Sequence, residues 1–287
     1  MSQQNAYQVS EWNGRSGERW VAHQSRLDAM LAVFGEAAIR TARVRAGEQV
    51  LDIGCGAGTS SRELAALVGA GGRVLGLDIS APLVERARLL APPGARLAFE
   101  LADAATADLP VAAFDLLFSR FGVMFFDDPA AAFARLRRAL RPGGRLVFVC
   151  WREAAGNDWV RLPMGAIAGL VPPPAPPGPE APGPFSFGDG ARVTRILKEA
   201  GFADIELAAF DSAIPFGEGD SREQAIEDAL YMASEVGPLS RVLADQPEDI
   251  RTRAAQAVRA AFAARPGTRS VMIDGAAWVV SANNPVA

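Results

Sequence analysis

Short apolar runs alternate along this chain with longer segments whose apolar residues recur every three or four positions. A short apolar run is typical of a buried strand, and a period near 3.6 is typical of an amphipathic helix. The first five runs predict strands at residues 49–53, 73–79, 95–101, 114–119 and 145–151. Since strands that alternate with helices build parallel sheets, the pattern predicts the α/β class.

The same pattern suggests how the chain is divided. Helical periodicity is clearest over residues 15–45, 129–140, 190–200 and 220–265, and two further strands are expected at 202–210 and 278–281. Residues 172–184 contain eight prolines, a density that a strand interior does not tolerate. We therefore expect an N-terminal helical lid over residues 1–45 and a main domain over 46–287. That domain carries cap insertions at about 156–188 and 220–265.

The strand at residues 49–53 leads into three glycines, Gly54, Gly56 and Gly58. Glycine adopts positive φ and has no Cβ, so a ligand can approach the backbone closely there. Ser60 and Glu63 match a capping box, which predicts a helix that begins at this serine. A strand, a glycine turn and a helix N-terminus together predict a nucleotide-type site with backbone N–H groups directed at the ligand.

The spacing of the glycines separates two kinds of nucleotide site. A dinucleotide fingerprint of the G-x-G-x-x-G type requires its third glycine at position 59, which is Thr59 here. The stretch from Val50 to Gly58 instead resembles motif I of the class I S-adenosylmethionine-dependent methyltransferases. In that motif an acidic residue, here Asp52, and G-x-G-x-G accompany the first strand.

Later motifs extend this resemblance over residues 48–151, in the order and spacing of the family. Asp78 ends the second strand, Asp103-Ala104 follows the third, and Leu-Arg-Pro-Gly-Gly at 140–144 precedes the fifth. The chain is most similar to the branch that holds ubiquinone/menaquinone and natural-product methyltransferases. The resemblance implies a Rossmann-like, mostly parallel sheet of seven strands with an antiparallel last strand. It also implies S-adenosyl-L-methionine as methyl donor and S-adenosyl-L-homocysteine as product.

The strand ends supply the expected donor-binding residues. A carboxylate at the tip of the second strand is well placed to accept both hydroxyls of a ribose, which assigns Asp78 to that role. The resemblance implies that Asp103 accepts the exocyclic amine of the adenine. The full expected set is Asp52, Gly54, Cys55, Gly56, Gly58, Asp78, Ile79, Asp103, Ala104 and Ser119.

The acceptor side is less well defined by the sequence. Residues 120–126 are apolar and aromatic, which suits either an acceptor pocket or core packing. His23 is the only histidine, and its unperturbed pKa near neutrality makes it a candidate base, although its apolar helix face favours a packing role. Tyr7, Tyr231 and Asp127 are further candidates, and catalysis by proximity alone requires no base.

Composition narrows the class of protein. A net charge of −4 and a pI near 5.3 give no general attraction to nucleic acid. With Cys55, Cys150 and His23 as the only cysteines and histidine, the sequence contains neither a Cys/His zinc cluster nor a disulfide framework. Residues 1–14 do not resemble a signal peptide, and no apolar run reaches membrane-span length. We therefore expect a cytoplasmic enzyme without a bound metal.

Three functions remain open at this point. The first is methyl transfer to an oxygen, nitrogen or carbon atom of a small acceptor that is apolar or aromatic. The second is a dinucleotide-dependent oxidoreductase, which Thr59 disfavours. The third is a non-catalytic module that binds S-adenosylmethionine, and only turnover separates it from the first. The acceptor's identity and the oligomeric state are not encoded in any motif that we find.

Overall fold

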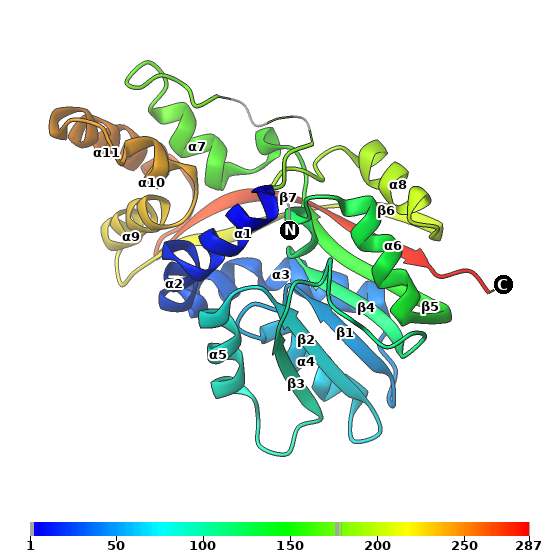
Figure 1. Ribbon diagram of the computed structural model, residues 1–287. Coiled ribbons are helices and arrows are strands. Elements are labelled where there is room, and N and C mark those ends of the chain that lie inside the picture. Colours follow the sequence, from blue (N-terminus) through cyan, green and yellow to red (C-terminus); the bar gives the residue numbers. More distant parts are fainter. Residues whose placement is uncertain (1–2, 176–177, 179, 287) are drawn as a thin grey trace.

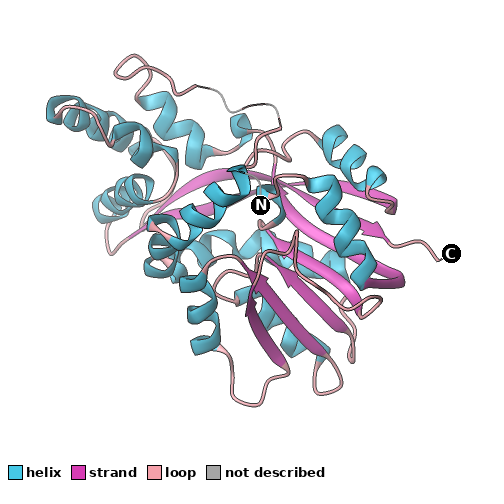
Figure 2. Ribbon diagram, in the orientation of Figure 1, coloured by secondary structure: helices cyan, strands magenta, loops and turns pink. Residues whose placement is uncertain are grey.

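A single sheet organises the computed structural model, which describes residues 3–175, 178 and 180–286. Within these residues seven strands lie in the order β3-β2-β1-β4-β5-β7-β6 (Figures 1 and 2). They are β1 (Gln49–Ile53), β2 (Arg73–Asp78), β3 (Leu97–Leu101), β4 (Phe114–Arg120), β5 (Leu140–Trp151), β6 (Ala203–Glu218) and β7 (Ser270–Asn283). β7 runs antiparallel to both of its neighbours, and the β1–β5 pairs are parallel. The Rossmann-like, mostly parallel sheet with an antiparallel last strand is confirmed.

The central strands are buried because helices cover both faces of the sheet. The helices are α1 (Gln3–Asn13), α2 (Arg15–Ala22), α3 (Gln24–Ala42), α4 (Thr59–Val68), α5 (Ala81–Leu90), α6 (Pro129–Ala139), α7 (Asp158–Ala166), α8 (Gly190–Glu199), α9 (Arg222–Glu235), α10 (Pro238–Leu243) and α11 (Glu248–Ala263). In Figure 1, α3 and α4 lie behind the sheet and α6 lies in front of it. Phe34 of α3 and Phe133 of α6 are fully buried on their respective sides. The burial of residues 50–53 of β1, three of which are apolar, agrees with this double cover.

The N-terminal segment is built differently from the single helix expected over residues 15–45. Helix α1 precedes it, and the expected helix is divided at His23, whose φ of −106° and ψ of 17° are not helical. Gly17 lets α2 fold back against α1, since a Cβ at this position would lie 2.1 Å from the carbonyl oxygen of Trp12. The apolar periodicity continues through His23, so it gave no sign of the break.

The expected capping box is also wrong. Helix α4 begins at Thr59, with Gly58 at the N-cap in the left-handed conformation and no side-chain cap. The Ser60 hydroxyl instead donates to the carboxylate of Asp52 at 2.8 Å, a buried tertiary contact that a local motif does not reveal. Ser80 stands at the N-cap of α5 as expected, but its hydroxyl donates to the Trp12 carbonyl at 2.6 Å rather than to the helix.

The two expected insertions lie at one edge of the sheet. Residues 220–265 form α9, α10 and α11 rather than one helix, and they connect the carboxyl end of β6 to β7. Residues 156–188 leave the carboxyl end of β5 and include α7. Because β6 is parallel to β5, both segments emerge at the edge where the parallel strands end. This is the edge where open α/β sheets bind ligands.

Candidate active site

A cavity of about 1710 Å³ opens at the carboxyl ends of the parallel strands. This volume exceeds that of a usual pocket for one small molecule, so the cavity has room for two. Its floor comes from the segments after β1, β2, β3 and β4, and its roof comes from three other parts of the chain. The described roof residues fall within 5–31, 151–186 and 235–246.

The glycine loop after β1 forms part of the floor. Gly54 and Gly56 have φ angles of 65° and 54°, which favour glycine. A Cβ on Gly54 would lie 2.7 Å from the Cα of Gly122, whereas a Cβ on Gly56 would meet nothing within 4 Å. The space beside Gly54 is therefore filled by the backbone of Gly122. The space beside Gly56 is empty, and Gly56 lines the cavity.

Asp78 lies at the tip of β2 beside this loop. One carboxylate oxygen accepts the backbone N–H of Gly56 at 2.8 Å, and the other accepts that of Ser80 at 2.9 Å. Burial raises the pKa of Asp78, and these N–H bonds oppose the rise. Each oxygen can still accept a further hydrogen bond. Asp78 and Ile79 both line the cavity, so a ligand there could supply the donor.

Asp103 and Ala104 line the cavity at the end of β3. One Asp103 oxygen accepts the backbone N–H of Ala105 at 2.8 Å, which fixes the loop. The other accepts the side-chain amide of Asn5 at 2.9 Å, so α1 reaches across to this carboxylate. At the other end of α1, the Asn13 side chain donates to the Ile79 carbonyl and accepts the Ala81 N–H.

Three expected donor-binding residues are not among the described residues that line the cavity: Asp52, Gly58 and Ser119. Asp52 is fully buried and accepts the hydroxyls of Ser60 and Ser61. Ser119 donates to the Ile53 carbonyl at 2.7 Å and accepts the Gly122 N–H at 3.1 Å. In this structure they shape the floor of the cavity from beneath rather than face it.

Cys55 lines the cavity as expected, in surroundings that disfavour its thiolate. Burial first, and then the negative charges of Asp78 and Asp52, raise the pKa of its thiol well above the usual range.

His23 does not line the described cavity. Its side chain is 15% exposed and its Nε2 lies 3.9 Å from a carboxylate oxygen of Glu235. Its ring meets Tyr231 edge-on with centroids 5.5 Å apart, and Tyr231 also lies outside the described lining. Of the other candidate bases, Tyr7 and Asp127 line the cavity.

The sequence reading missed a polar network that borders the glycine loop. Arg120 donates to Asp28 at 2.7 Å, and Asp28 also accepts the hydroxyl of Thr59. Burial alone raises the pKa of Asp28, but Arg120 and the hydrogen bonds of Thr59 and Gln24 bring it below its usual value. Arg120 is the last residue of β4, and a charge at a strand end was the available signal.

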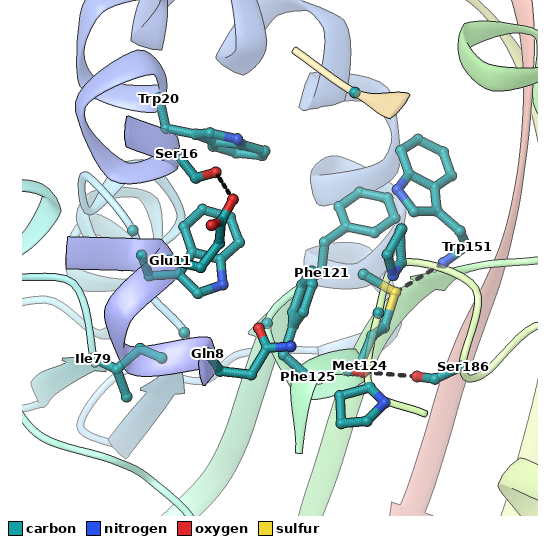
Figure 3. Close-up of a pocket in the computed structure, with 18 of the residues that line it drawn as sticks. Gln8, Glu11, Ser16, Trp20, Ile79, Phe121, Met124, Phe125, Trp151 and Ser186 are labelled. Carbon is teal, nitrogen blue, oxygen red and sulfur yellow. Dashed lines mark hydrogen bonds between the residues drawn. The ribbon is translucent and has the colours of Figure 1, made fainter. Parts of the chain in front are cut away.

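Aromatic side chains form the wall of the cavity at the ends of β4 and β5 (Figure 3). Phe121 stacks on Trp151 with centroids 4.2 Å apart, and Trp12 of α1 meets Phe125 edge-on at 5.5 Å. Of the five tryptophans in the chain, four line this cavity, namely Trp12, Trp20, Trp151 and Trp159. So much aromatic surface in one place indicates a ligand site in addition to a core.

Metal binding has no support in the described part of the chain, where no three His, Cys, Asp or Glu side chains gather in a way that could hold an ion.

Comparison with known proteins identifies the class. Residues 51–148 match the family described as methyltransferase domain. Nocamycin O-methyltransferase of Saccharothrix syringae is 32% identical over 56% of this chain and 61% of its own length. Aklanonic acid methyltransferase DauC of Streptomyces sp. (strain C5) is 40% identical over 36% of this chain and 47% of its own length. Across the first three curated relatives the match spans 30% to 61% of their length.

Solved structures agree at the level of the fold. Phosphoethanolamine N-methyltransferase 2 of Haemonchus contortus, solved in complex with S-adenosyl-L-methionine, superposes with a TM-score of 0.51 at 18% identity. The superposition covers 88% of this chain and 52% of that one. Residues 51–148 therefore form a methyltransferase domain, and the sheet order and glycine loop give the chain the fold of the class I S-adenosylmethionine-dependent methyltransferases.

Asp52 makes the stability of the protein depend on pH. Burial raises the pKa of the Asp52 carboxyl to about 6, because it outweighs the opposing hydrogen bonds from the serine hydroxyls. The Oδ1 atom of Asp52 has no hydrogen-bond partner in the described chain. A carboxyl whose pKa is raised by folding stabilises the fold at pH values below its pKa in the unfolded chain. This stabilisation is lost as the pH rises through about 6. Between pH 4 and 7.5 the free energy of unfolding of the wild type should therefore fall by up to about 3 kcal/mol, and Asp52→Asn should remove this fall.

Urea unfolding at a series of pH values measures this difference. The exposed carboxylate of Asp108 provides the control, since Asp108→Asn should keep the wild-type slope. Equal pH slopes for wild type and Asp52→Asn would contradict the assignment.

His23 is expected to stabilise the junction between α2 and α9 through its ring contact. Edge-on aromatic pairs contribute about 0.5–1.5 kcal/mol, so we expect His23→Gln to lower the free energy of unfolding by about 1 kcal/mol. His23→Phe keeps an aromatic ring at this position and should retain most of the stability. Denaturant unfolding at pH 7.5 tests both variants, and a His23→Gln protein as stable as wild type would exclude the packing role.

Proposed function

We propose that this protein transfers a methyl group from S-adenosyl-L-methionine to a small, apolar or aromatic acceptor. One observation carries the proposal: a single cavity joins the glycine loop and Asp78 to an aromatic wall. The first part suits a nucleoside and the second suits an organic acceptor. The curated relatives named above act, by their names, on nocamycin and aklanonic acid, which are small molecules.

The residues around the loop fit the donor. Gly56 leaves open space where a side chain would otherwise project, and its N–H is held by Asp78. Asp78 offers lone pairs for two ribose hydroxyls, and Asp103 offers one for an exocyclic amine. Ile79 and Ala104 add apolar surface for the base. We assign these residues, with Gly54 and Cys55, to the donor site, and S-adenosyl-L-homocysteine leaves from the same place.

The bound donor supplies a methyl group on a positively charged sulfur, which needs little further activation. The work left to the chain is to align the acceptor and exclude water. Phe121, Trp151 and Phe125 offer flat apolar surface for alignment. The roof formed by α1, α2, α10 and the segment after β5 shields the cavity, so we assign α1 and α2 as a lid and the two insertions as a cap. Helix α3 packs against the sheet, so the lid that we assign is shorter than the one expected over residues 1–45.

The alternatives differ in what they require. An oxidoreductase needs a dinucleotide fingerprint, and Gly58 is followed by Thr59 rather than by glycine. A non-catalytic binding module shares the donor site and is separated only by turnover. None of the described helices is long and apolar enough to cross a membrane. A cytoplasmic location and the absence of nucleic acid as a partner stay parts of this proposal.

The donor assignment predicts the effect of Asp78→Ala. Hydrogen bonds to a charged group contribute about 1.5–3 kcal/mol each, so we expect the affinity for S-adenosyl-L-methionine to fall by at least about tenfold. Titration calorimetry measures this affinity directly. Asp108→Ala, which removes an exposed carboxylate outside the described lining, should bind like wild type.

Two outcomes would contradict the proposal. Unchanged affinity in a folded Asp78→Ala variant would exclude this residue from the donor site. Binding of NADH by the wild type with strength comparable to S-adenosyl-L-methionine would favour the oxidoreductase instead.

The lid assignment predicts protection from hydrogen exchange. Asn5 and Asn13 tie α1 to the ends of β3 and β2, directly over the donor site. We expect amide exchange in residues 3–13 to slow when S-adenosyl-L-homocysteine is added, because the ligand fills the space beneath. Helix α11, which lies outside the described lining, serves as the internal reference. Slowing confined to residues 54–58 would show that α1 is not a cover.

A further inference from the structure

Gln8 is a polar side chain that faces the cavity. It lies on the inner side of α1, is 8% exposed and lines the cavity. Its amide atoms are not among the fully enclosed polar atoms without a partner in the described chain, so they remain accessible from the cavity. Figure 3 shows the amide directed into the cavity toward Phe125. An amide that faces the cavity can both donate to and accept from a ligand there.

Glu11 follows one turn later on the same side of the helix. Residues three apart on a helix are neighbours, so its carboxylate and the Gln8 amide face the same region. One carboxylate oxygen accepts the Ser16 hydroxyl at 2.5 Å (Figure 3). The other oxygen has no partner in the described chain, and Glu11 also lines the cavity. An ionised carboxylate is an acceptor only, so it selects a ligand that carries a hydroxyl or N–H donor.

The wall opposite these two side chains is aromatic. Phe121 and Trp151 stack on one another there, and Phe125 meets Trp12 edge-on. This wall favours a flat ring, which gains both buried area and favourable ring geometry.

These residues are separate from the contacts that α1 makes over the donor. Asn5, one turn before Gln8, contacts Asp103, and Asn13 contacts the Ile79 carbonyl. Gln8 lies between these two contacts, and its amide is directed toward the aromatic wall at the end of β4 rather than toward either of them (Figure 3).

We propose that Gln8 and Glu11 bind the methyl acceptor, and that this acceptor is a flat phenol that also carries a carbonyl oxygen. The hydroxyl donates to Glu11, the carbonyl oxygen accepts from the Gln8 amide, and the ring lies on the Phe121–Trp151 wall. That the bound molecule accepts the methyl group rests on the proposed function, whereas its binding can be measured independently.

Two planar probes that differ by one hydroxyl test this binding: 7-hydroxycoumarin and coumarin. With the full-length protein saturated with S-adenosyl-L-homocysteine at pH 6.5, calorimetry should show 7-hydroxycoumarin binding about tenfold more tightly than coumarin. Glu11→Gln should remove most of this difference. Gln8→Leu should weaken both probes by about tenfold, because both carry the carbonyl group.

Exposed residues of the same types supply matched controls. Gln4→Leu in α1 and Glu18→Gln in α2 remove side chains that lie outside the described lining, and both variants should bind both probes like wild type. The melting temperature of Gln8→Leu gives a second readout. A melting temperature close to that of wild type shows that weaker probe binding in that variant is not caused by unfolding.

The inference is overturned if 7-hydroxycoumarin does not bind the wild type, or if both variants bind the two probes as wild type does. It is also overturned if the variants weaken S-adenosyl-L-homocysteine and leave the coumarins unaffected, because the two residues then belong to the donor site. Failure of S-adenosyl-L-homocysteine to bind the wild type contradicts the proposed function instead. The probe titrations without it still decide whether Gln8 and Glu11 bind a phenol.

Discussion

The close contact between the backbones of Gly54 and Gly122 is the constraint on which the rest of the site depends. A Cβ on Gly122 would lie 2.6 Å from the Ile53 carbonyl oxygen, so the ends of β1 and β4 can meet only without side chains. The Ser119 hydroxyl bonds both segments and holds them there. This contact fixes the glycine loop relative to Phe121 and the aromatic wall, so one cavity can hold a donor and an acceptor side by side.

The sequence predicted the sheet because buried strands leave uninterrupted apolar runs, and it predicted the donor side because strand ends and glycine turns are local features. Gly54, Gly56, Asp78 and Asp103 accordingly line the cavity. The capping box at Ser60 was wrong because the buried carboxylate of Asp52, eight residues earlier in the chain, accepts the hydroxyl. A local motif indicates which groups a side chain can bind, and the tertiary structure determines which of them becomes its partner.

The roof could not be predicted in the same way. Residues 1–14 are mostly polar, and only the folded chain shows that Gln8 faces inward while Gln4 faces solvent. The bond between Asp28 and Arg120 joins residues 92 positions apart, and neither lies in a recognisable motif. Where a helix carries few apolar residues, its sequence pattern does not indicate which side is buried.

The contacts of the N-terminal helices with α9 bear on the order in which the protein assembles. Arg19 donates to the Glu235 carbonyl 216 positions later, and Arg26 bonds Asp228 202 positions later. Closing loops of this length costs conformational entropy that the contacts repay only once both ends are structured. During synthesis the strands from β1 to β5 can pair first, while the floor of the cavity stays open to water. The roof of the cavity is therefore expected to be among the last parts of the molecule to form.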